Sequence, residues 1–231
     1  MTADHIECWL GSIDADATHD QWQCLNAAEF AHATSITNPL LRNRYVIVRS
    51  RLRQLLGQKL VVAPESINFS IAAHGKPYLA DCPELAFNLS HSANHWAIAI
   101  GRHCRLGVDI EIAKPRQNLA SLVEKCFGEP EAAYWHSLPE AQQTATFYRF
   151  WTRKEAFVKA TGRGIALGLK HCVLNPEQQT GFLSVPDEYQ PASAWRIQDI
   201  ALAQGFFGAL ALDSVAAEVR LIQFAAQSIQ Q

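Results

Sequence analysis

The order of its periodic segments constrains the fold of this chain most: a helix followed by short strands, and then helices and strands again. Apolar residues, among them Val48 and Leu52, recur at helical spacing from Arg42 to Leu56, and Gly57 is predicted to end this helix. Strands are predicted next at 67–72, 86–90, 95–100 and 106–111. The second series consists of helices at 118–127, 130–137 and 139–161 and strands at 169–174, 195–200, 205–212 and 219–224. The chain thus contains two series of helices followed by strands. In each series the helices would cover a small sheet, which indicates an α+β protein.

This repetition predicts two pseudo-duplicated lobes, each a small antiparallel sheet packed with a helix, with the active site between the lobes. The 231 residues suffice for one large domain or two small ones. The run Lys114-Pro115-Arg116 is predicted to be a hinge. It divides the chain into an N-terminal lobe of residues 1–113 and a C-terminal lobe of residues 114–231.

Composition excludes several classes of protein. With 48% hydrophobic and 18% charged residues the chain is not intrinsically disordered, and with 20 basic against 22 acidic residues it is not a globally basic nucleic-acid binder. The longest strongly apolar stretch, 206–212, is too short to span a membrane, and the N-terminus does not resemble a secretory leader. The six scattered cysteines suggest reduced thiols. We therefore expect a cytoplasmic monomer without nucleic-acid or membrane partners.

Two carboxylates on one strand form the first candidate site. Leu106, Val108 and Ile110 alternate with Gly107, Asp109 and Glu111, so that Asp109 and Glu111 are predicted to lie on the face opposite the apolar one. Carboxylates this close repel each other unless a cation or a proton lies between them, and hard oxygen ligands suit Mg²⁺. The alternative is a solvated polar face.

The helix at 139–161 carries a third carboxylate. Trp151, Glu155 and Lys159 follow one another at steps of four residues and share one face. They are interpreted either as a surface Glu–Lys pair or as an acid and a cation directed into the cleft.

A second group of candidates lies in the N-terminal half. In Asn88-Leu89-Ser90-His91-Ser92, neighbouring side chains on a strand point to opposite faces, so Ser90 and His91 cannot form a nucleophile–base pair. A phosphate-binding or a structural histidine is the alternative. The turn Gly75-Lys76-Pro77 is interpreted as a nucleotide-gripping turn or a plain one, and the arginines of the first helix as a phosphate-facing stripe or a solvated face.

The joint order of these motifs resembles one family. An Arg-rich helix is followed by Gly-Lys-Pro, Asn-x-Ser-His-Ser, Gly-Val-Asp-Ile-Glu and Trp-x-x-Lys-Glu-Ala-Phe-Val-Lys-Ala-x-Gly. This pattern, from Leu41 to Gly164 and including Phe127-x-x-x-Glu131, resembles the 4′-phosphopantetheinyl transferase superfamily in its single-chain, two-lobe form, and Trp151 with Lys-Glu-Ala resembles its W/KEA branch. Cys126 departs from the pattern, since many members have a Phe pair there.

The resemblance implies an activity. A holo-[acyl-carrier-protein] synthase of this family transfers the 4′-phosphopantetheine arm of coenzyme A to a serine of an apo acyl or peptidyl carrier protein. Such carriers serve fatty-acid, polyketide or nonribosomal peptide synthesis. The reaction requires Mg²⁺ and releases adenosine 3′,5′-bisphosphate. Two rival hypotheses are another Mg²⁺-dependent phosphoryl or nucleotidyl transferase and a non-catalytic coenzyme A-binding relative.

The resemblance also assigns roles to residues. Asp109, Glu111 and Glu155 would hold the metal, and Asp109, Glu155 and Lys159 would be catalytic, with Glu155 either a ligand or a base and Lys159 on the leaving phosphate. The expected coenzyme A contacts are His91 with Arg49 or Arg44 at the 3′-phosphate, Gly75, Lys76 and Pro77 at the adenine side, and Asn88 and Ser90 elsewhere on the nucleotide. Arg102, Arg105, Lys114 and Arg116 are candidates for binding the acidic carrier protein.

Overall fold

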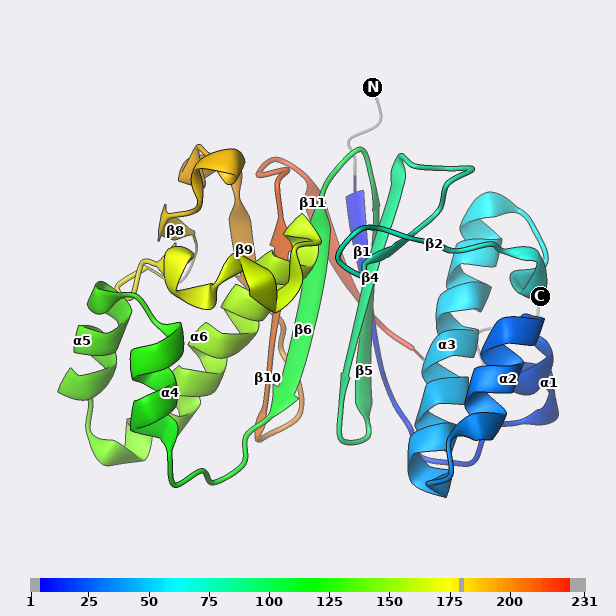
Figure 1. The fold of residues 1–231 in the computed structure, drawn as a ribbon, viewed down its shortest axis with the longest axis horizontal. Helices are drawn as coiled ribbons and strands as arrows, with labels where there is room; N and C mark the ends of the chain where they lie inside the picture. Colours follow the sequence, from blue (N-terminus) through cyan, green and yellow to red (C-terminus); the bar gives the residue numbers. More distant parts are fainter. Residues whose placement is uncertain (1–4, 179–180, 225–231) are drawn as a thin grey trace.

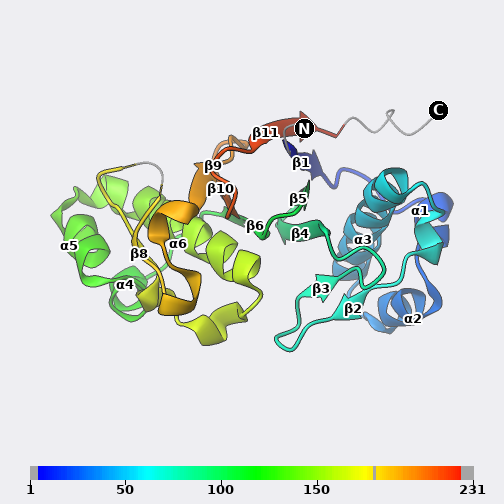
Figure 2. The same ribbon diagram turned by 90° about the horizontal axis from the view of Figure 1, so that it is seen from above.

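Two groups of helices flank a central region of strands in the computed structural model, which describes residues 5–178 and 181–224 (Figure 1). The helices within residues 19–60 lie on one side, and those within residues 119–161 lie on the other. The view from above shows the strands between them (Figure 2). None of the helices in the described residues has the length and apolar character needed to cross a membrane. The cytoplasmic location stays a prediction.

The first sheet has the strand order β11-β1-β5-β4. Its strands are β1 (His5–Ser12), β4 (Leu85–Ser92), β5 (His95–Arg102) and β11 (Glu218–Gln223). Pairing is antiparallel except between β1 and β11, which run parallel. Helix α3 (Pro39–Leu60) covers this sheet, because Leu52 and Leu56 are buried in one cluster with Trp96 and Ile98 of β5. The short helices α1 (His19–Gln23) and α2 (Ala27–Ser35) complete this side.

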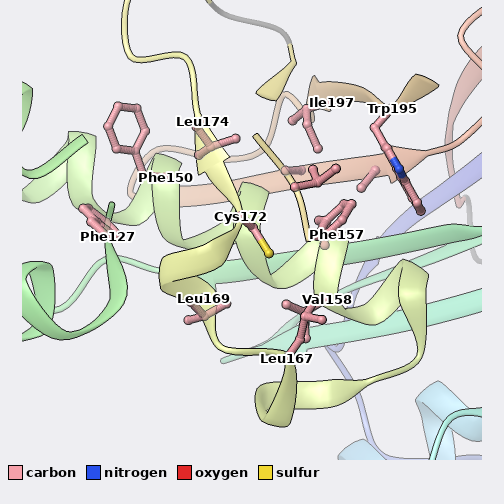
Figure 3. Close-up of a cluster of buried hydrophobic side chains, with 14 of the residues drawn as sticks. Phe127, Phe150, Phe157, Val158, Leu167, Leu169, Cys172, Leu174, Trp195 and Ile197 are labelled. Carbon is pink, nitrogen blue, oxygen red and sulfur yellow. The ribbon is translucent and has the colours of Figure 1, made fainter. Parts of the chain in front are cut away.

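The second sheet has the strand order β6-β10-β9 and is antiparallel. Its strands are β6 (Leu106–Ile112), β9 (Arg196–Asp199) and β10 (Phe206–Leu212), and its helices are α4 (Leu119–Cys126), α5 (Glu129–Ser137) and α6 (Glu140–Thr161). Phe157 of α6 lies in an aromatic core with Trp195, at 4.6 Å between ring centroids (Figure 3). A third buried cluster, including Ala97, Val108 and Leu210, joins the faces of the two sheets turned away from α3 and α6.

Short elements connect these layers. They are the hairpin of β2 (Ser70–Ile71) and β3 (Pro77–Tyr78), the pair β7 (Val173–Leu174) and β8 (Phe182–Ser184), and 3₁₀ turns at 64–66, 164–167, 169–171, 187–189 and 192–194.

The predicted α+β class with small sheets and covering helices is confirmed. The sheets, however, exchange strands across the predicted division at residue 113. Strand β6, from the first half of the chain, pairs with β10, and β11, from the second half, pairs with β1. The two sheets thus do not follow the division into residues 1–113 and 114–231, and the division into lobes stays a prediction.

Helix α3 is longer than predicted at both ends. The side chain of Asn38 caps its first amides, at Leu40 and Leu41, and the helix continues through Gly57 to Leu60. Gly57 is needed inside the helix, because a Cβ there would meet the backbone oxygen of Val62 at 2.8 Å. The predicted stop at Gly57 is therefore wrong. By contrast, Gly162 ends α6 as predicted, with φ of 74°.

Candidate active site

Strand β6 and helix α6 bring the predicted acidic residues together at the centre of the molecule, where the two elements lie side by side (Figures 1 and 2). Gly107 permits this approach, because a Cβ there would lie 2.2 Å from the backbone oxygen of Ala156. Asp109 and Glu111 follow Gly107 on the same face of the strand. The lack of a side chain at Gly107 thus sets α6 close enough for Glu155 and Lys159 to reach that face.

Asp109 is the most buried of the acidic residues in this cluster, with 4% of its surface exposed. Its Oδ1 accepts hydrogen bonds from Lys159 Nζ at 2.7 Å and from Ser90 Oγ at 2.9 Å. Its Oδ2 is buried and has no hydrogen-bond partner among the described residues. Burial raises the pKa of Asp109, against the opposing effect of the Lys159 ammonium. The interpretation as a solvated strand face is therefore wrong for Asp109, and Lys159 bonds to Asp109 instead of forming only a surface pair on α6.

The pKa values of Glu111 and Glu155 are also raised in this cluster. Burial and then the nearby Asp109 charge raise the pKa of Glu155 to about 7, with a smaller contribution from Glu111. Burial and the charge of Asp109 also raise the pKa of Glu111, while Ser92 Oγ donates to its Oε2 at 2.9 Å and opposes the shift. Repulsion of this kind between carboxylate charges indicates that the three carboxylates lie near one another.

The repulsion predicts an unusual pH dependence for the metal-free protein. Glu155 keeps its proton up to about pH 7 in the folded chain but loses it near its ordinary value of 4.5 when unfolded, so stability falls as the pH rises through this window. Glu155→Gln cannot ionise. It is therefore expected to raise the melting temperature at pH 8, by an amount equivalent to at most about 3 kcal/mol, and to change it little near pH 4.5. Calorimetry in a chelating buffer measures both values. An equal difference at the two pH values would contradict the assignment.

The chemistry of the donor set fits a hard divalent cation. The carboxylates offer oxygen ligands, the Oδ2 of Asp109 is a buried acceptor that no described residue satisfies, and burial followed by the charges of Asp109 and Glu111 raises the pKa of Glu155. Within 5–178 and 181–224, no three His, Cys, Asp or Glu side chains are already arranged as a complete metal-binding group. Lys159 supplies the positive charge beside Asp109 in this arrangement.

Side chains of β4 join the first sheet to β6. Alternate residues of β4 accept hydrogen bonds from alternate backbone amides of β6, in a series that we term the side-chain ladder. Its three rungs are Val108 N to Asn88 Oδ1 at 2.9 Å, Ile110 N to Ser90 Oγ at 3.2 Å and Ile112 N to Ser92 Oγ at 3.0 Å. Asn88 and Ser90, which were expected to contact nucleotide, are thus buried and bonded to β6. Their contact with nucleotide stays a prediction.

His91 lies on the other face of β4 from Ser90 and is exposed, as the strand period predicts. Desolvation, followed by the charge of Arg44, lowers the pKa of His91. Arg44 also donates to the backbone oxygen of Ala93 at 3.2 Å. Arg49, in contrast, is 3.5 Å from the carboxylate of Glu29. Of the two arginines considered from sequence, Arg44 is therefore the one near His91.

The Gly75-Lys76-Pro77 turn lies in the β2–β3 hairpin, and Gly75 adopts a φ of 86°. The Lys76 side chain does not point freely into solvent. Its Nζ donates to the backbone oxygens of Leu106 and Ala160, both at 3.0 Å, and burial lowers its pKa to about 8. Lys76 thus ties the hairpin to the start of β6 and the end of α6.

The structure separates two residues that are adjacent in the Lys-Glu-Ala motif. Lys154 points away from the site and forms a fully buried ion pair with Glu131 of α5. Glu131 also accepts from Gly128 N at 2.6 Å and from Leu174 N at 3.0 Å. In the sequence, Glu131 is part of the family pattern, but no role could be assigned to it there. Its position at N3 of α5 is the signal that could have assigned one.

The four basic residues expected to bind the carrier lie in two groups at opposite ends of β6, and their role stays a prediction. Arg102 pairs with Glu84, and Arg105 pairs with Asp213, before β6 begins. Lys114 and Arg116 follow the other end of β6, where Arg116 Nε donates to Tyr148 Oη at 3.0 Å. The seven residues of β6 separate the two pairs by roughly 20 Å.

Comparison with known proteins gives consistent matches. The family model described as the 4′-phosphopantetheinyl transferase superfamily matches residues 105–212, from β6 to β10. The chain is 34% identical to the 4′-phosphopantetheinyl transferase HetI of Nostoc sp. (strain PCC 7120) over 206 residues, which cover 87% of this chain and 84% of HetI. It is 31% identical to the putative 4′-phosphopantetheinyl transferase slr0495 of Synechocystis sp. (strain PCC 6803), covering 83% and 78%. It is 30% identical to Sfp of Bacillus subtilis (strain 168), covering 61% and 62%.

These matches confirm the resemblance drawn from the motifs. The family model includes the β6 and α6 segments that hold the carboxylates, and the matches to HetI and slr0495 extend over most of the chain. The protein therefore belongs to the 4′-phosphopantetheinyl transferase superfamily.

Proposed function

We propose that this chain transfers the 4′-phosphopantetheine arm of coenzyme A to a serine of an apo acyl or peptidyl carrier protein, with Mg²⁺, and releases adenosine 3′,5′-bisphosphate. The observation that carries the proposal is the cluster of the buried Asp109 with the half-buried Glu111 and Glu155 beside Lys159. Membership of the transferase family supports the reaction. Since both sheets that frame the cluster belong to one chain, we expect a monomer to be active.

Charge neutralisation is the main task of the site. Attack on the pantetheine-side phosphorus of the pyrophosphate places negative charge on the leaving phosphate. Mg²⁺ held by Asp109, Glu111 and Glu155 would neutralise the pyrophosphate oxygens. Lys159, whose ammonium already lies beside Asp109, would hold the leaving phosphate.

Glu155 would also accept the proton of the attacking serine, directly or through a water. In the metal-free chain, burial followed by the charges of Asp109 and Glu111 raises the pKa of Glu155 to about 7, and a bound Mg²⁺ would lower this pKa again. Its partial exposure leaves it accessible to an incoming hydroxyl. The same carboxylate is thus suited to bind the metal and to take the proton.

The nucleotide would bind along β4 and the β2–β3 hairpin. His91 and Arg44 would hold the 3′-phosphate, because Arg44 is the arginine near His91 while Arg49 is engaged by Glu29. The backbone of the Gly75–Pro77 turn would contact the adenine side.

His91→Ala is expected to weaken discrimination between coenzyme A and 3′-dephospho-coenzyme A. The lost charge-assisted hydrogen bond is worth about 1.5–3 kcal/mol, or roughly 10- to 150-fold in KM for coenzyme A. The kcat should change less, because the 3′-phosphate does not react. Steady-state kinetics with the two substrates measure the effect. Equal discrimination by the variant and the wild type would assign His91 to structure alone.

The proposed function is tested by incubating an apo acyl carrier protein with the chain, coenzyme A and Mg²⁺, followed by intact-mass spectrometry of the carrier. The expected result is a mass increase of one phosphopantetheine arm, which is absent when the acceptor serine of the carrier is replaced by alanine. If the carrier stays unmodified and the chain turns over nucleotide without any carrier present, the chain is a different phosphoryl transferase.

A further inference from the structure

The side-chain ladder joins β4 to β6 where the two sheets meet. In the described part of the chain, backbone hydrogen bonds pair β4 with β5 and β6 with β10, so β4 and β6 belong to different sheets. The offset of each rung is constant, from Asn88 to Val108 and from Ser92 to Ile112, so the two strands run in the same direction. The ladder thus connects the sheets through side chains at this edge.

The rungs differ in what else they touch. Asn88 accepts from the backbone of β6, at Val108. Ser90 and Ser92 accept from the same strand but also donate to carboxylates of the cluster, Asp109 and Glu111, at 2.9 Å in both cases. Two rungs of the ladder thus connect the first sheet directly to the acidic residues carried by the second.

Ser92 has a single hydroxyl hydrogen, and it is directed to Glu111. The Oγ accepts from Ile112 N at 3.0 Å and donates to Glu111 Oε2 at 2.9 Å, so both of these contacts lie on β6. The residue is buried, with 8% of its surface exposed. The amide on its acceptor side therefore fixes the hydroxyl, and the hydroxyl in turn restrains the Glu111 carboxylate.

We infer that Ser92 is a positioning residue of the metal site, which acts through Glu111 and through the attachment of β6 to β4. This inference rests on the proposed function for the metal, while the attachment of β6 stands independently of it. Hydrogen-bond partners that orient metal ligands typically change metal affinity by about 10- to 100-fold when they are removed. The class of ligand concerned is a hard divalent cation.

The test compares Ser92→Ala, Ser92→Thr and Asn88→Ala in the full chain by two measurements. Calorimetric titration with Mg²⁺ in the presence of coenzyme A gives the metal affinity, and amide hydrogen exchange gives the protection of Val108 and Ile112. Ser92→Ala should weaken Mg²⁺ binding by about 10- to 100-fold and speed exchange at Ile112. Ser92→Thr keeps the hydroxyl and should restore both values to within a few-fold. Asn88→Ala should instead speed exchange at Val108 and leave the protection of Ile112 close to that of the wild type.

Unchanged Mg²⁺ affinity in Ser92→Ala would overturn the positioning role, and unchanged protection of Ile112 would overturn the attachment. A wild-type chain that binds no Mg²⁺ would overturn the metal-site part of the inference. A wild-type chain that binds Mg²⁺ but leaves the carrier unmodified would contradict the proposed function, while the Ser92 comparison would still decide the positioning role.

Discussion

Asp109→Ala is expected to lower the rate of phosphopantetheine transfer on the order of 10³-fold or more. The substitution removes the carboxylate that accepts a hydrogen bond from Lys159, and with it a ligand that the proposed metal requires. Stabilisation of developing charge by a metal is worth several kcal/mol, which corresponds to a loss of this size. A transfer assay at saturating Mg²⁺ and coenzyme A measures it.

The folded structure is expected to survive this change. Asp109 is buried, its Oδ2 is unsatisfied by the described residues, and its burial raises its pKa, so removing the carboxylate also removes an unfavourable charge. Circular dichroism and the melting temperature should therefore stay close to those of the wild type. Glu218→Gln is a matched control, because Glu218 pairs with Arg220 on the surface outside the cluster, and it should transfer normally. Turnover by Asp109→Ala within a few-fold of the wild type would eliminate the proposed metal site.

The second large effect concerns stability. Lys154→Met or Glu131→Leu is expected to lower the free energy of unfolding by about 3–5 kcal/mol, because each leaves the other charge buried and unpaired. Glu131→Leu should cost more, since the amides of Gly128 and Leu174 also lose their acceptor. Denaturant unfolding measures the changes.

The double variant distinguishes the energy of the ion pair from that of the hydrogen bonds that Glu131 accepts from backbone amides. With both charges removed, much of the loss due to Lys154→Met should be recovered, whereas the amides left by Glu131 remain unsatisfied. The exposed pair Arg220–Glu218 is a control whose removal should shift the denaturation midpoint little. Additive losses in the double variant, equal to the sum of the two single ones, would show that Glu131 and Lys154 do not stabilise each other.

The elements nearest the site could be predicted because their signals are local. The alternation in β6 and the long periodic segment of α6 gave both elements to within two residues, and Gly162 marked the end of α6. The first strand and helices were missed although they carry similar signals. Ile6, Cys8 and Leu10 alternate in β1, and side-chain caps begin α1 and α2.

The sheet arrangement could not be predicted, because it depends on pairing between distant segments. Nothing local to β11 indicates that it pairs with β1 in parallel, or that β6 joins β10. Partners of individual side chains are equally non-local. The sequence places Lys76 in a turn, but its bonds to Leu106 and Ala160 require the folded chain. For the same reason, only the folded chain shows which arginine lies near His91. Arg49 pairs with Glu29, and Arg44 is the one near His91.

The claim that Asp109, Glu111 and Glu155 form one metal site is tested most directly by calorimetric titration of Mg²⁺ into the full chain in the presence of coenzyme A. The wild type should bind one Mg²⁺, and Asp109→Asn and Glu155→Gln should each weaken this binding by at least about 10-fold, because each removes a charged ligand. Glu218→Gln should bind Mg²⁺ as the wild type does. Binding by Asp109→Asn and Glu155→Gln with the affinity of the wild type would contradict the account.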